Sequence, residues 1–371
     1  MNIKFNKTPE QIAMIKDMVS KNKETRENAR EAFAGAIAPV IQEVILNAST
    51  LGGIYRDVPF DQNTEASIPF DTYFDEAAGL FQIWSQNSAG GLPSNFTHSV
   101  SELKVQTYTL ETAISFNKKY AEQSRLDVIS KAMTRMANEV LLRTELNGWL
   151  VILKALANAT TKSKQHIFKT ETAGVLNLHD LNTLATRSKR INSSYDNGTP
   201  DSTVSRGVTD IYLSPEAMEL LRALSYNPVN IRQATSGTSS IPATDAQRES
   251  LWASGGASSF LGFALHELNE LGKNYKYNNV FATVAGSTAY VKADGTSSGT
   301  FSTSTQEIIV GFDASRDGLF RPVEINADSQ GQLVVYPDDQ FPARSEKFGF
   351  YAKVTEGRVC ADARMIQGLV L

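Results

Sequence analysis

The strongest regular pattern of apolar and polar positions covers residues 124–158. Apolar side chains recur there at steps of three and four, as one face of an α-helix requires, and no proline interrupts them. At about 1.5 Å per residue, this segment predicts a rod of about 50 Å that organises the elements around it. Its apolar face consists of Leu126, Ile129, Met133, Met136 and Val140, followed with a drift in phase by Leu146, Leu150, Leu153 and Leu156.

The first 50 residues predict two further helical segments. Residues 1–30 are polar and favour a helix that begins with Thr8 as its cap and Pro9 in its first turn. We interpret this segment either as an arm that is solvated or loosely docked, or as an arm that contacts a partner, because its apolar stripe is narrow. In the more apolar stretch that follows, Pro39 predicts an interruption and a short amphipathic helix after it. The narrow stripe consists of Ile12, Ile15, Met18 and Val19.

Residues 51–101 change character, because glycines and prolines separate short pieces that favour β-strands. About 50 residues with weak periodicity are unusual inside a compact domain, so we predict an extended hairpin that projects from the body. Its apolar side chains have few partners nearby in the sequence and must be covered by another part of the molecule or by another subunit. These side chains are Ile68, Phe70, Tyr73, Phe74, Phe81, Ile83 and Trp84.

The rest of the chain alternates between strands and shorter helices. Residues 102–116 predict a long strand with a bulge or twist near Thr109, where the alternation breaks. Residues 178–191 predict a helix, and a turn-rich boundary follows it at 193–206. Ser214 and Pro215 then mark the start of a helix that runs through residue 224.

The C-terminal half is predicted to be mostly β-structure. Residues 285–305 indicate a surface hairpin with Asp294 and Gly295 at its tip. A final pair of strands, 348–354 and 359–364, should turn at Glu356 and Gly357. The other predicted strands are 208–213, 260–265, 280–284, 308–312, 319–325 and 333–336.

Composition narrows the class of protein. The chain has 371 residues, 41% of them hydrophobic, which is enough for a sizeable core in two or three domains or in one extended subunit with insertions. No apolar run is long enough for a membrane helix, and the N-terminal sequence is unlike a secretory signal. The single cysteine, Cys360, excludes an intramolecular disulfide and a cysteine-based zinc site. A formal net charge of -4 argues against a dedicated nucleic-acid binder.

Several polar groups invite a chemical interpretation, but each has a simpler structural one. Adjacent residues on a regular strand point to opposite faces, so Asp338 and Asp339 are not expected to act together as a pair of catalytic carboxylates. Residues 313–324 partly match a calcium loop, but a strand precedes them and Pro322 disturbs the ligand positions, so a turn between strands is favoured. The dipeptides His179–Asp180 and His266–Glu267 lack a matching nucleophile motif. Cys360 lies in an apolar strand pattern, as a buried small hydrophobe would. We therefore expect no catalytic residue, cofactor or metal ligand.

The sequence near the C-terminus resembles a known family. Residues 336–351 contain an acidic pair, an aromatic residue, an arginine, a basic residue and a glycine-aromatic strand, and residues 359–364 end in a V-x-D-x-R-like strand. Together with the order of elements, this resembles the major capsid protein of tailed bacteriophages, with the Hong Kong phage-type fold that encapsulin shells share. The resemblance covers most of the chain as architecture and about the last 35 residues as motif.

The resemblance implies an α+β fold with five parts. These are an N-terminal arm (1–50), an extended β-hairpin loop (51–101), a peripheral domain with a spine helix (102–206), an axial α/β domain (207–328) and a return to the peripheral domain (329–371). The extended loop would lie on a neighbouring subunit. The implied contact residues between subunits are Phe70, Tyr73, Phe81 and Trp84 on the loop, with Asp339 and Arg344 as charge partners.

The function implied by the resemblance is that of a shell subunit. Hexamers and pentamers would enclose the double-stranded DNA of a tailed phage, held non-specifically, in a virion assembled in the host cytoplasm without a membrane. The founding member joins its subunits by Lys–Asn isopeptide bonds, but residues 51–101 contain no lysine and no asparagine follows Asn326, so a non-covalent shell is expected. The short N-terminal arm suggests a separate scaffolding protein, with a portal and a decoration protein as further partners. An encapsulin-like compartment and a soluble enzyme remain the alternatives.

Overall fold

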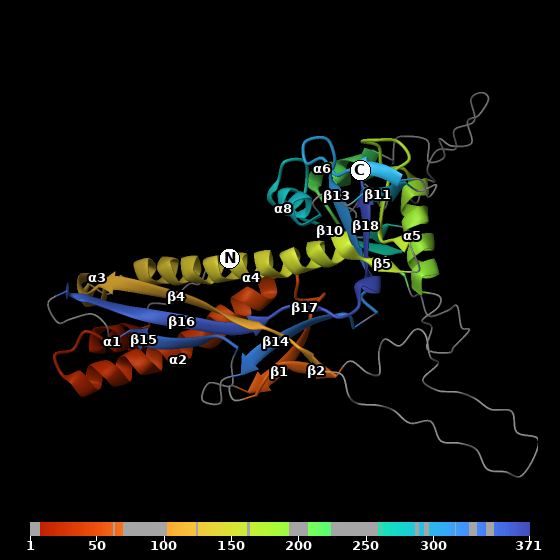
Figure 1. Ribbon diagram of the computed structural model, residues 1–371. Coiled ribbons are helices and arrows are strands. Elements are labelled where there is room, and N and C mark those ends of the chain that lie inside the picture. The colour runs from red at the N-terminus through yellow and green to blue at the C-terminus, as the bar shows by residue number, and fades with distance from the viewer. Residues whose placement is uncertain are drawn as a thin grey trace, which may run out of the picture. The chain divides into compact units, whose positions relative to one another are not determined.

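The computed structural model describes residues 8–61, 64–69, 102–123, 125–161, 164–192, 207–223, 259–260, 262–285, 289–292, 297–315, 317–325, 332–338 and 345–371 (Figure 1). The chain divides into two compact units. Unit 1 comprises Met1–Gly148 and Phe320–Val359, and unit 2 comprises Trp149–Leu319 and Cys360–Leu371. The fold is α+β, as the sequence predicts.

Unit 1 is built on a six-stranded sheet that contains β1 (Arg56–Asp61), β14 (Leu319–Ile325), β16 (Lys347–Gly357) and β15 (Val334–Asp338) in that order. Strand β4 (Thr107–Asn117) pairs antiparallel with β16 along all of its length, and β17 (Val359–Cys360) pairs with β14. Strand β1 pairs parallel with β14. Side chains of β4 alternate between exposed and more buried, so one face of the sheet meets the core.

Two N-terminal helices pack onto this sheet, α1 (Pro9–Asp17) and α2 (Lys23–Ala48). The Thr8 hydroxyl accepts a hydrogen bond from the Gln11 amide, which confirms Thr8 as the cap. Ile15 and Met18 are fully buried, so the described part of this arm is docked rather than solvated. The buried Arg30 guanidinium donates to the Met18 carbonyl at 3.3 Å and fixes α1 against α2.

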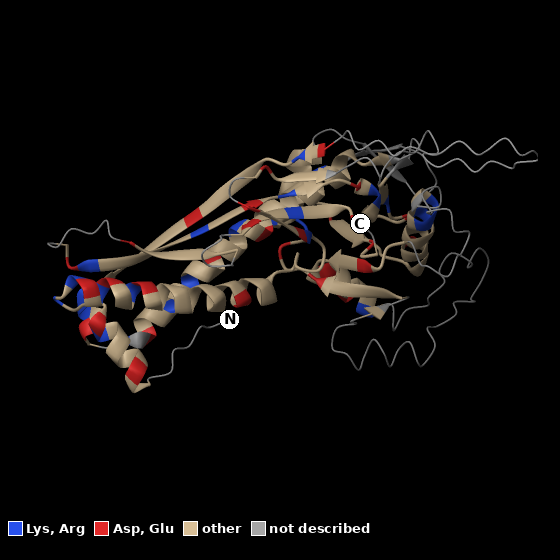
Figure 2. Cartoon of the chain, turned by 90° about the horizontal axis from the view of Figure 1, so that it is seen from below, with Lys and Arg blue, Asp and Glu red and all other residues tan. Residues whose placement is uncertain are grey.

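The predicted interruption at Pro39 is wrong, because α2 continues through it to Ala48. Pro39 and Gly35 both lie on the exposed side of the helix, where water can satisfy the Gly35 carbonyl that loses its donor. Figure 2 shows that charged residues gather on the N-terminal half of α2. Between residues 32 and 48 the sequence carries one charge, Glu43.

The core of unit 1 lies between these helices, the first part of α4 (Leu126–Asn158) and the inner face of the sheet. The aromatic rings of Phe33 and Phe350 are 5.3 Å apart, and those of Phe116 and Phe348 are 5.5 Å apart. Helix α4 confirms the predicted long helix, and its predicted apolar positions Ile129, Met133 and Met136 are all buried. The short α3 (Lys118–Glu122) follows β4 directly.

Unit 2 contains an eight-stranded mixed sheet in the order β12-β11-β7-β18-β13-β8-β10-β9. Helices α5 (Leu178–Asn192) and α6 (Pro215–Ala223) confirm two predicted helices, and the Ser214 hydroxyl accepts from the Ala217 amide as the predicted cap. The Trp149 ring is buried among Tyr212, Tyr277 and Phe312, as expected of a core residue. The strands are β7 (Ile167–Lys169), β8 (Asp210–Leu213), β9 (Ser259–Phe260), β10 (Phe263–Glu267), β11 (Ala289–Lys292), β12 (Ser297–Thr300), β13 (Ile308–Phe312) and β18 (Ile366–Val370), with a separate pair β5 (Thr160–Thr161) and β6 (Lys164–Gln165).

Two strand predictions in unit 2 need correction. Residues 280–284 belong to helix α8 (Lys276–Ala285), because the buried Tyr277, Phe281 and Ala285 recur every four residues over a longer window. The predicted strand 260–265 is divided, since Gly262 adopts a φ of 84° between β9 and β10. Strands β11 and β12 pair antiparallel and confirm the predicted hairpin, whose tip lies outside the described residues.

The predicted C-terminal strand pair is also wrong. Strand β16 pairs with β4 along one edge and with β15 along the other. The chain that follows β16 therefore finds no open edge on which it could pair back. Instead, β17 pairs with β14, the 3-10 helix η4 (Ala363–Met365) follows, and β18 enters the sheet of unit 2. In the predicted long strand 102–116, the break falls at Val105 and Gln106, between β3 (Glu102–Lys104) and β4, and not near Thr109. Within the described ranges, no helix combines the length and apolarity needed to cross a membrane.

Candidate functional site at the root of the extended loop

The six residues predicted to contact a neighbouring subunit, Phe70, Tyr73, Phe81, Trp84, Asp339 and Arg344, lie outside the described residues. What the structure describes is the root of the extended loop, which we define as residues 49–61, 64–69 and 102–108 with the side chains that hold them. Each part of this root belongs to unit 1. The root determines where the rest of the loop leaves the body.

The two ends of the loop are paired. Strand β2 (Ser67–Pro69) lies antiparallel to β3 with Ile68 opposite Leu103, as the base of a hairpin requires. The Val105 amide donates to the Ala66 carbonyl at 2.9 Å, and Lys104 forms an exposed ion pair with Glu65. Ile68 is buried by its own chain, so this member of the predicted apolar set needs no second subunit.

The chain before β1 is clamped to one turn of α4. The Glu145 carboxylate accepts hydrogen bonds from the Ser49 hydroxyl at 2.6 Å, from the Thr50 amide at 3.1 Å and from the Thr50 hydroxyl. One turn later, the Tyr55 hydroxyl donates to the Gly148 carbonyl at 2.9 Å. These hydrogen bonds satisfy the buried carboxylate and fix the segment 49–55 on the helix.

Gly148 allows this close contact. A Cβ atom at this position would overlap Leu51 Cδ1, and Leu51 is itself fully buried. The Arg358 guanidinium carbon lies 4.5 Å from the centre of the Tyr55 ring and packs against this segment from the side of the sheet. The glycine that the sequence presents as a weak helix former is therefore required for packing.

A buried ionic cluster joins β1, β4, β14 and β16. Glu356 is fully buried, and its carboxylate accepts from Arg321 Nε at 2.7 Å, from Arg358 at 3.3 Å and from the Tyr108 hydroxyl at 2.8 Å. Arg321 also pairs with Asp57 of β1 at 3.5 Å. The side-chain amide of Gln332 bridges the two, since it donates to Asp57 at 3.1 Å and accepts from Arg321 at 3.3 Å. The cluster therefore fixes β1, which leads into the loop.

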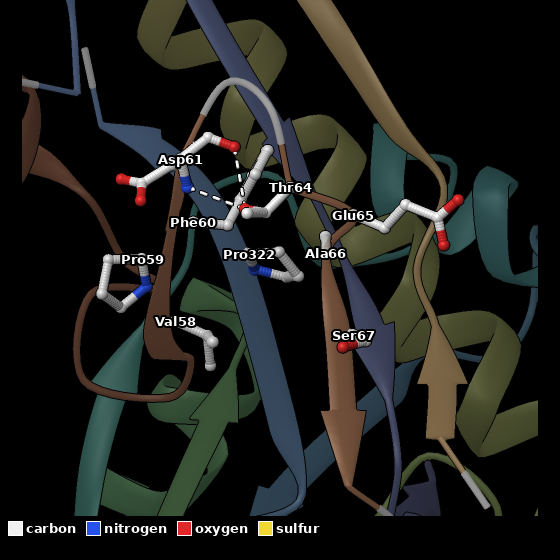
Figure 3. A pocket seen from close by; sticks show the side chains of 9 residues that line it. All are labelled: Val58, Pro59, Phe60, Asp61, Thr64, Glu65, Ala66, Ser67 and Pro322. Carbon is white, nitrogen blue, oxygen red and sulfur yellow. Dashed lines mark hydrogen bonds between the residues drawn. The ribbon is translucent and has the colours of Figure 1, made fainter. Parts of the chain in front are cut away.

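A small pocket lies beside this cluster, where the chain turns between residues 61 and 64 (Figure 3). The Asp61 amide donates to the Thr64 hydroxyl at 3.1 Å and closes the turn. The pocket holds about 330 Å³ and is lined by Val58, Pro59, Phe60, Asp61, Thr64, Glu65, Ala66, Ser67 and Pro322. Pro322 lies between the two arms of the turn.

Comparison with known proteins places the fold. No model of a protein family matches the sequence, and neither does any curated protein. The structure is similar to the capsid of an empty GTA particle, with 12% identity and a TM-score of 0.51 over 87% of this chain and 89% of that chain. It is similar to the capsid of the cyanophage P-SCSP1u, with 13% identity and a TM-score of 0.51 over 87% and 88%. The chain has the Hong Kong phage-type capsid fold.

The polar residues for which the sequence invited a chemical interpretation have structural roles in this capsid fold. Asp180 reaches back to the Asn177 amide at 3.1 Å as a capping residue of α5, and burial raises the pKa of its carboxyl. His266 pairs with Asp210 at 2.9 Å and stacks on Tyr212 across parallel strands. The Asp313 carboxylate accepts from the Ser315 amide at 3.1 Å in a turn between β13 and β14, where the sequence predicts one.

Cys360 is half-buried in β17 of the capsid fold, and burial raises the pKa of its thiol to about 12. A thiol with so high a pKa is a poor nucleophile at neutral pH. In the part of the chain that the structure describes, no three His, Cys, Asp or Glu side chains are grouped so that they could hold a metal ion.

The sequence interpretation missed the residues that hold the loop root, namely Glu145, Gly148, Arg321, Glu356 and Arg358. A signal was present for two of them. Arg321 lies inside the apolar strand LFRPVEI, and Glu356 follows the apolar positions of β16. Charged residues at interior positions of strands predict an ion pair, since an unpaired charge is costly to bury.

Because of the cluster, the stability of the folded chain is expected to decrease at alkaline pH. Burial and the Glu356 carboxylate raise the pKa of Tyr108 above its ordinary value of 10. The folded chain keeps this proton at pH values where the unfolded chain releases it, so its stability should fall as the pH rises above about 10. In the variant Tyr108→Phe, urea unfolding at pH 9 to 11 should show a shallower fall, by at most about 1.4 kcal/mol per pH unit.

Tyr351 provides a matched control. Its hydrogen bond to Glu111 raises its pKa to about 12, but its hydroxyl is exposed to solvent, which screens the interaction. Tyr351→Phe should therefore change the alkaline slope less than Tyr108→Phe. Equal slopes in the two variants would contradict a special role for the buried cluster.

Proposed function

We propose that this chain is the major capsid protein of a tailed phage. In this proposal, copies assemble into hexamers and pentamers that form an icosahedral shell around double-stranded DNA. The observation that supports it is the likeness in fold to two capsid proteins over 87% of the chain. A separate scaffolding protein, a portal and a decoration protein are the proposed partners, and no catalytic role is proposed.

The loop root supports a role in joining subunits. Shell proteins need several interfaces, and specific interfaces bury about 1,200–2,000 Å² each. A hairpin whose base is paired and fixed by a buried ionic cluster can present its outer part in a defined direction. We propose that this part contacts a neighbouring subunit through Phe70, Tyr73, Phe81 and Trp84, with Asp339 and Arg344 as charge partners elsewhere.

Size-exclusion chromatography and electron microscopy of the expressed chain test the proposal. Spherical particles of megadalton size, or ring-shaped capsomers, are expected. A monomer or dimer that never assembles would contradict a shell and favour a soluble enzyme. Particles from the native source should contain DNA, whereas particles filled with protein cargo would identify an encapsulin-like compartment instead.

The shell should be held together without covalent bonds. Residues 51–101 contain no lysine for an isopeptide bond, and the raised pKa of Cys360 disfavours disulfide formation. Mature particles boiled in detergent without reductant should give one band at the mass of a single chain. A ladder of higher bands would contradict this expectation.

A further inference from the structure

We propose that the outer edge of strand β4 pairs with the same edge of a second copy of the chain, antiparallel and centred on Thr112. The inference rests on the proposed function, because a closed shell relates neighbouring copies by two-fold axes. It comes from three observations on unit 1, which are an open strand edge, the lack of features that block edge pairing, and a side-chain pattern that is complementary to itself.

Strand β4 has one paired edge and one open edge. It pairs with β16 over all eleven of its residues, from Thr107 to Asn117, without a shift in register. Among the described residues, β16 is the one strand that pairs with β4, so no described strand lies along its outer edge. A regular edge of this length is a template on which a further strand can form backbone hydrogen bonds.

The two ends of the sheet order are protected against such pairing, whereas β4 is not. Natural edge strands are kept apart by short length, proline, lysine and other charges, or a bulge. Strand β1 contains Pro59 and three charged residues, and β15 has only five residues, which include Pro337. The eleven residues of β4 include no proline, glycine or lysine, and their one charge is Glu111.

The core-facing side chains of β4 are incompletely covered. Leu110 and Ile114 alternate toward the core, but both are only half-buried, whereas Phe116 near the end of the strand is buried. A second strand on the open edge would cover more of Leu110 and Ile114 if it carried apolar side chains on the same face. The partner should therefore be a strand with the same alternation as β4.

A second β4 satisfies this requirement in one antiparallel register. With Thr112 opposite Thr112 of the second copy, all eleven residues are paired, because Thr112 is the midpoint of the strand. On the core-facing side, Leu110 then lies opposite Ile114, and Tyr108 lies opposite Phe116. Aliphatic side chains therefore meet aliphatic ones and aromatic rings meet aromatic rings, which are favourable cross-strand pairs.

The outer side of the strand selects the same register. With Thr112 at the centre, Glu111 lies opposite Ala113 of the second copy, so no two charges face each other. A shift that centres the pair on Glu111 would bring two carboxylates directly opposite each other, which is destabilising. A shift by a single residue would place core-facing side chains opposite outer ones. The centred register thus avoids charge repulsion and keeps every apolar side chain on one face.

Disulfide trapping on assembled particles tests this register. One full-length chain carries Glu111→Cys, a second carries Ala113→Cys, and the two are mixed before assembly and oxidised mildly. Directly opposite residues lie about 5 Å apart, within reach of a disulfide. The mixture should give a two-chain band on a non-reducing gel at several-fold the yield of either chain alone. Thr107→Cys replaces Glu111→Cys as the matched control, because it is exposed but out of register with Ala113→Cys, and should give several-fold less.

A change of charge adds a second measurement, with Thr109→Cys and Ser115→Cys as the trapping pair. Ala113→Glu in both chains should lower the yield of the two-chain band several-fold, because it places a second carboxylate opposite Glu111. Ala113→Lys should keep or raise the yield, because the lysine would face Glu111. Urea unfolding of both variants checks that each is folded.

The outcomes separate this pairing from the proposed function. Particles without the two-chain band, or an equal band from the out-of-register control, would overturn the pairing and leave the shell proposal standing. A two-chain band from a dimer that never forms particles would support the pairing and overturn the shell. Absence of both particles and band would overturn both proposals.

Discussion

Replacing Glu356 with glutamine is expected to lower the free energy of unfolding by about 3–5 kcal/mol. The carboxylate is fully buried and accepts from two arginines whose side chains are only 11% and 3% exposed. Glutamine has nearly the same shape but no charge, so Arg321 and Arg358 would remain buried without this carboxylate, and Arg321 would keep its ion pair with Asp57. Urea unfolding followed by far-ultraviolet circular dichroism measures the loss.

An exposed ion pair provides the control. Lys23 and Glu27 lie four residues apart on α2 at 3.6 Å, and both side chains are largely exposed. Glu27→Gln should change the stability by less than about 1 kcal/mol. Similar losses of stability in Glu27→Gln and Glu356→Gln would show that the buried cluster stabilises the fold no more than an exposed ion pair does.

The variant Gly148→Ala should be destabilised by about 1–3 kcal/mol, although alanine is the better helix former. Its Cβ would overlap Leu51 Cδ1, and Leu51 is fully buried, so its side chain would have to move within the core. The displaced segment 49–55 would also strain the hydrogen bonds to Glu145. Thermal and urea unfolding of the purified variant test this expectation.

Gly35→Ala is the matched control, because Gly35 lies inside α2 and a Cβ there meets no atom within 4 Å. This substitution should stabilise the chain by about 0.5–1 kcal/mol through helix propensity. The double variant Gly148→Ala with Leu51→Ala should lose less than the sum of its two single changes, since the smaller side chain removes the overlap. Additive losses would mean that Leu51 is not the obstacle.

The parts of the fold that follow from local pattern could be predicted from the sequence. Helix α4 was predictable because its apolar positions repeat over nine turns, and β13 and β14 match their predicted bounds because short apolar runs lie between turn residues. The caps at Thr8 and Ser214 were predictable because a hydroxyl before a proline satisfies the first helical amides.

The errors arise where tertiary contacts override local signals. Residues 280–284 look like a strand, but the Asn278 side chain bonds the Gln306 carbonyl and the Ile308 amide and holds α8 against β13. Pro39 is tolerated because its side of α2 faces solvent. The partner of β17 could not be inferred because it depends on which edges of β16 are already occupied.

The loop root could be predicted only in outline. A projecting hairpin follows from the weak periodicity of residues 51–101, and the pairing of Ile68 with Leu103 agrees with it. The cluster around Glu356 joins it to residues far away in the sequence, such as Arg321 and Asp57, although Arg358 is close by in the sequence. No local pattern connects such residues, so their pairing appears only when the sheet is assembled.

The state of Cys360 has a practical consequence for labelling experiments. With a pKa of about 12, only about one thiol in ten thousand is ionised at pH 8, so maleimide and iodoacetamide reagents should react with it slowly. The native chain therefore offers a nearly silent background for a single engineered cysteine. A dye placed in this way would report on one chosen position in every copy, with the natural residue left in place.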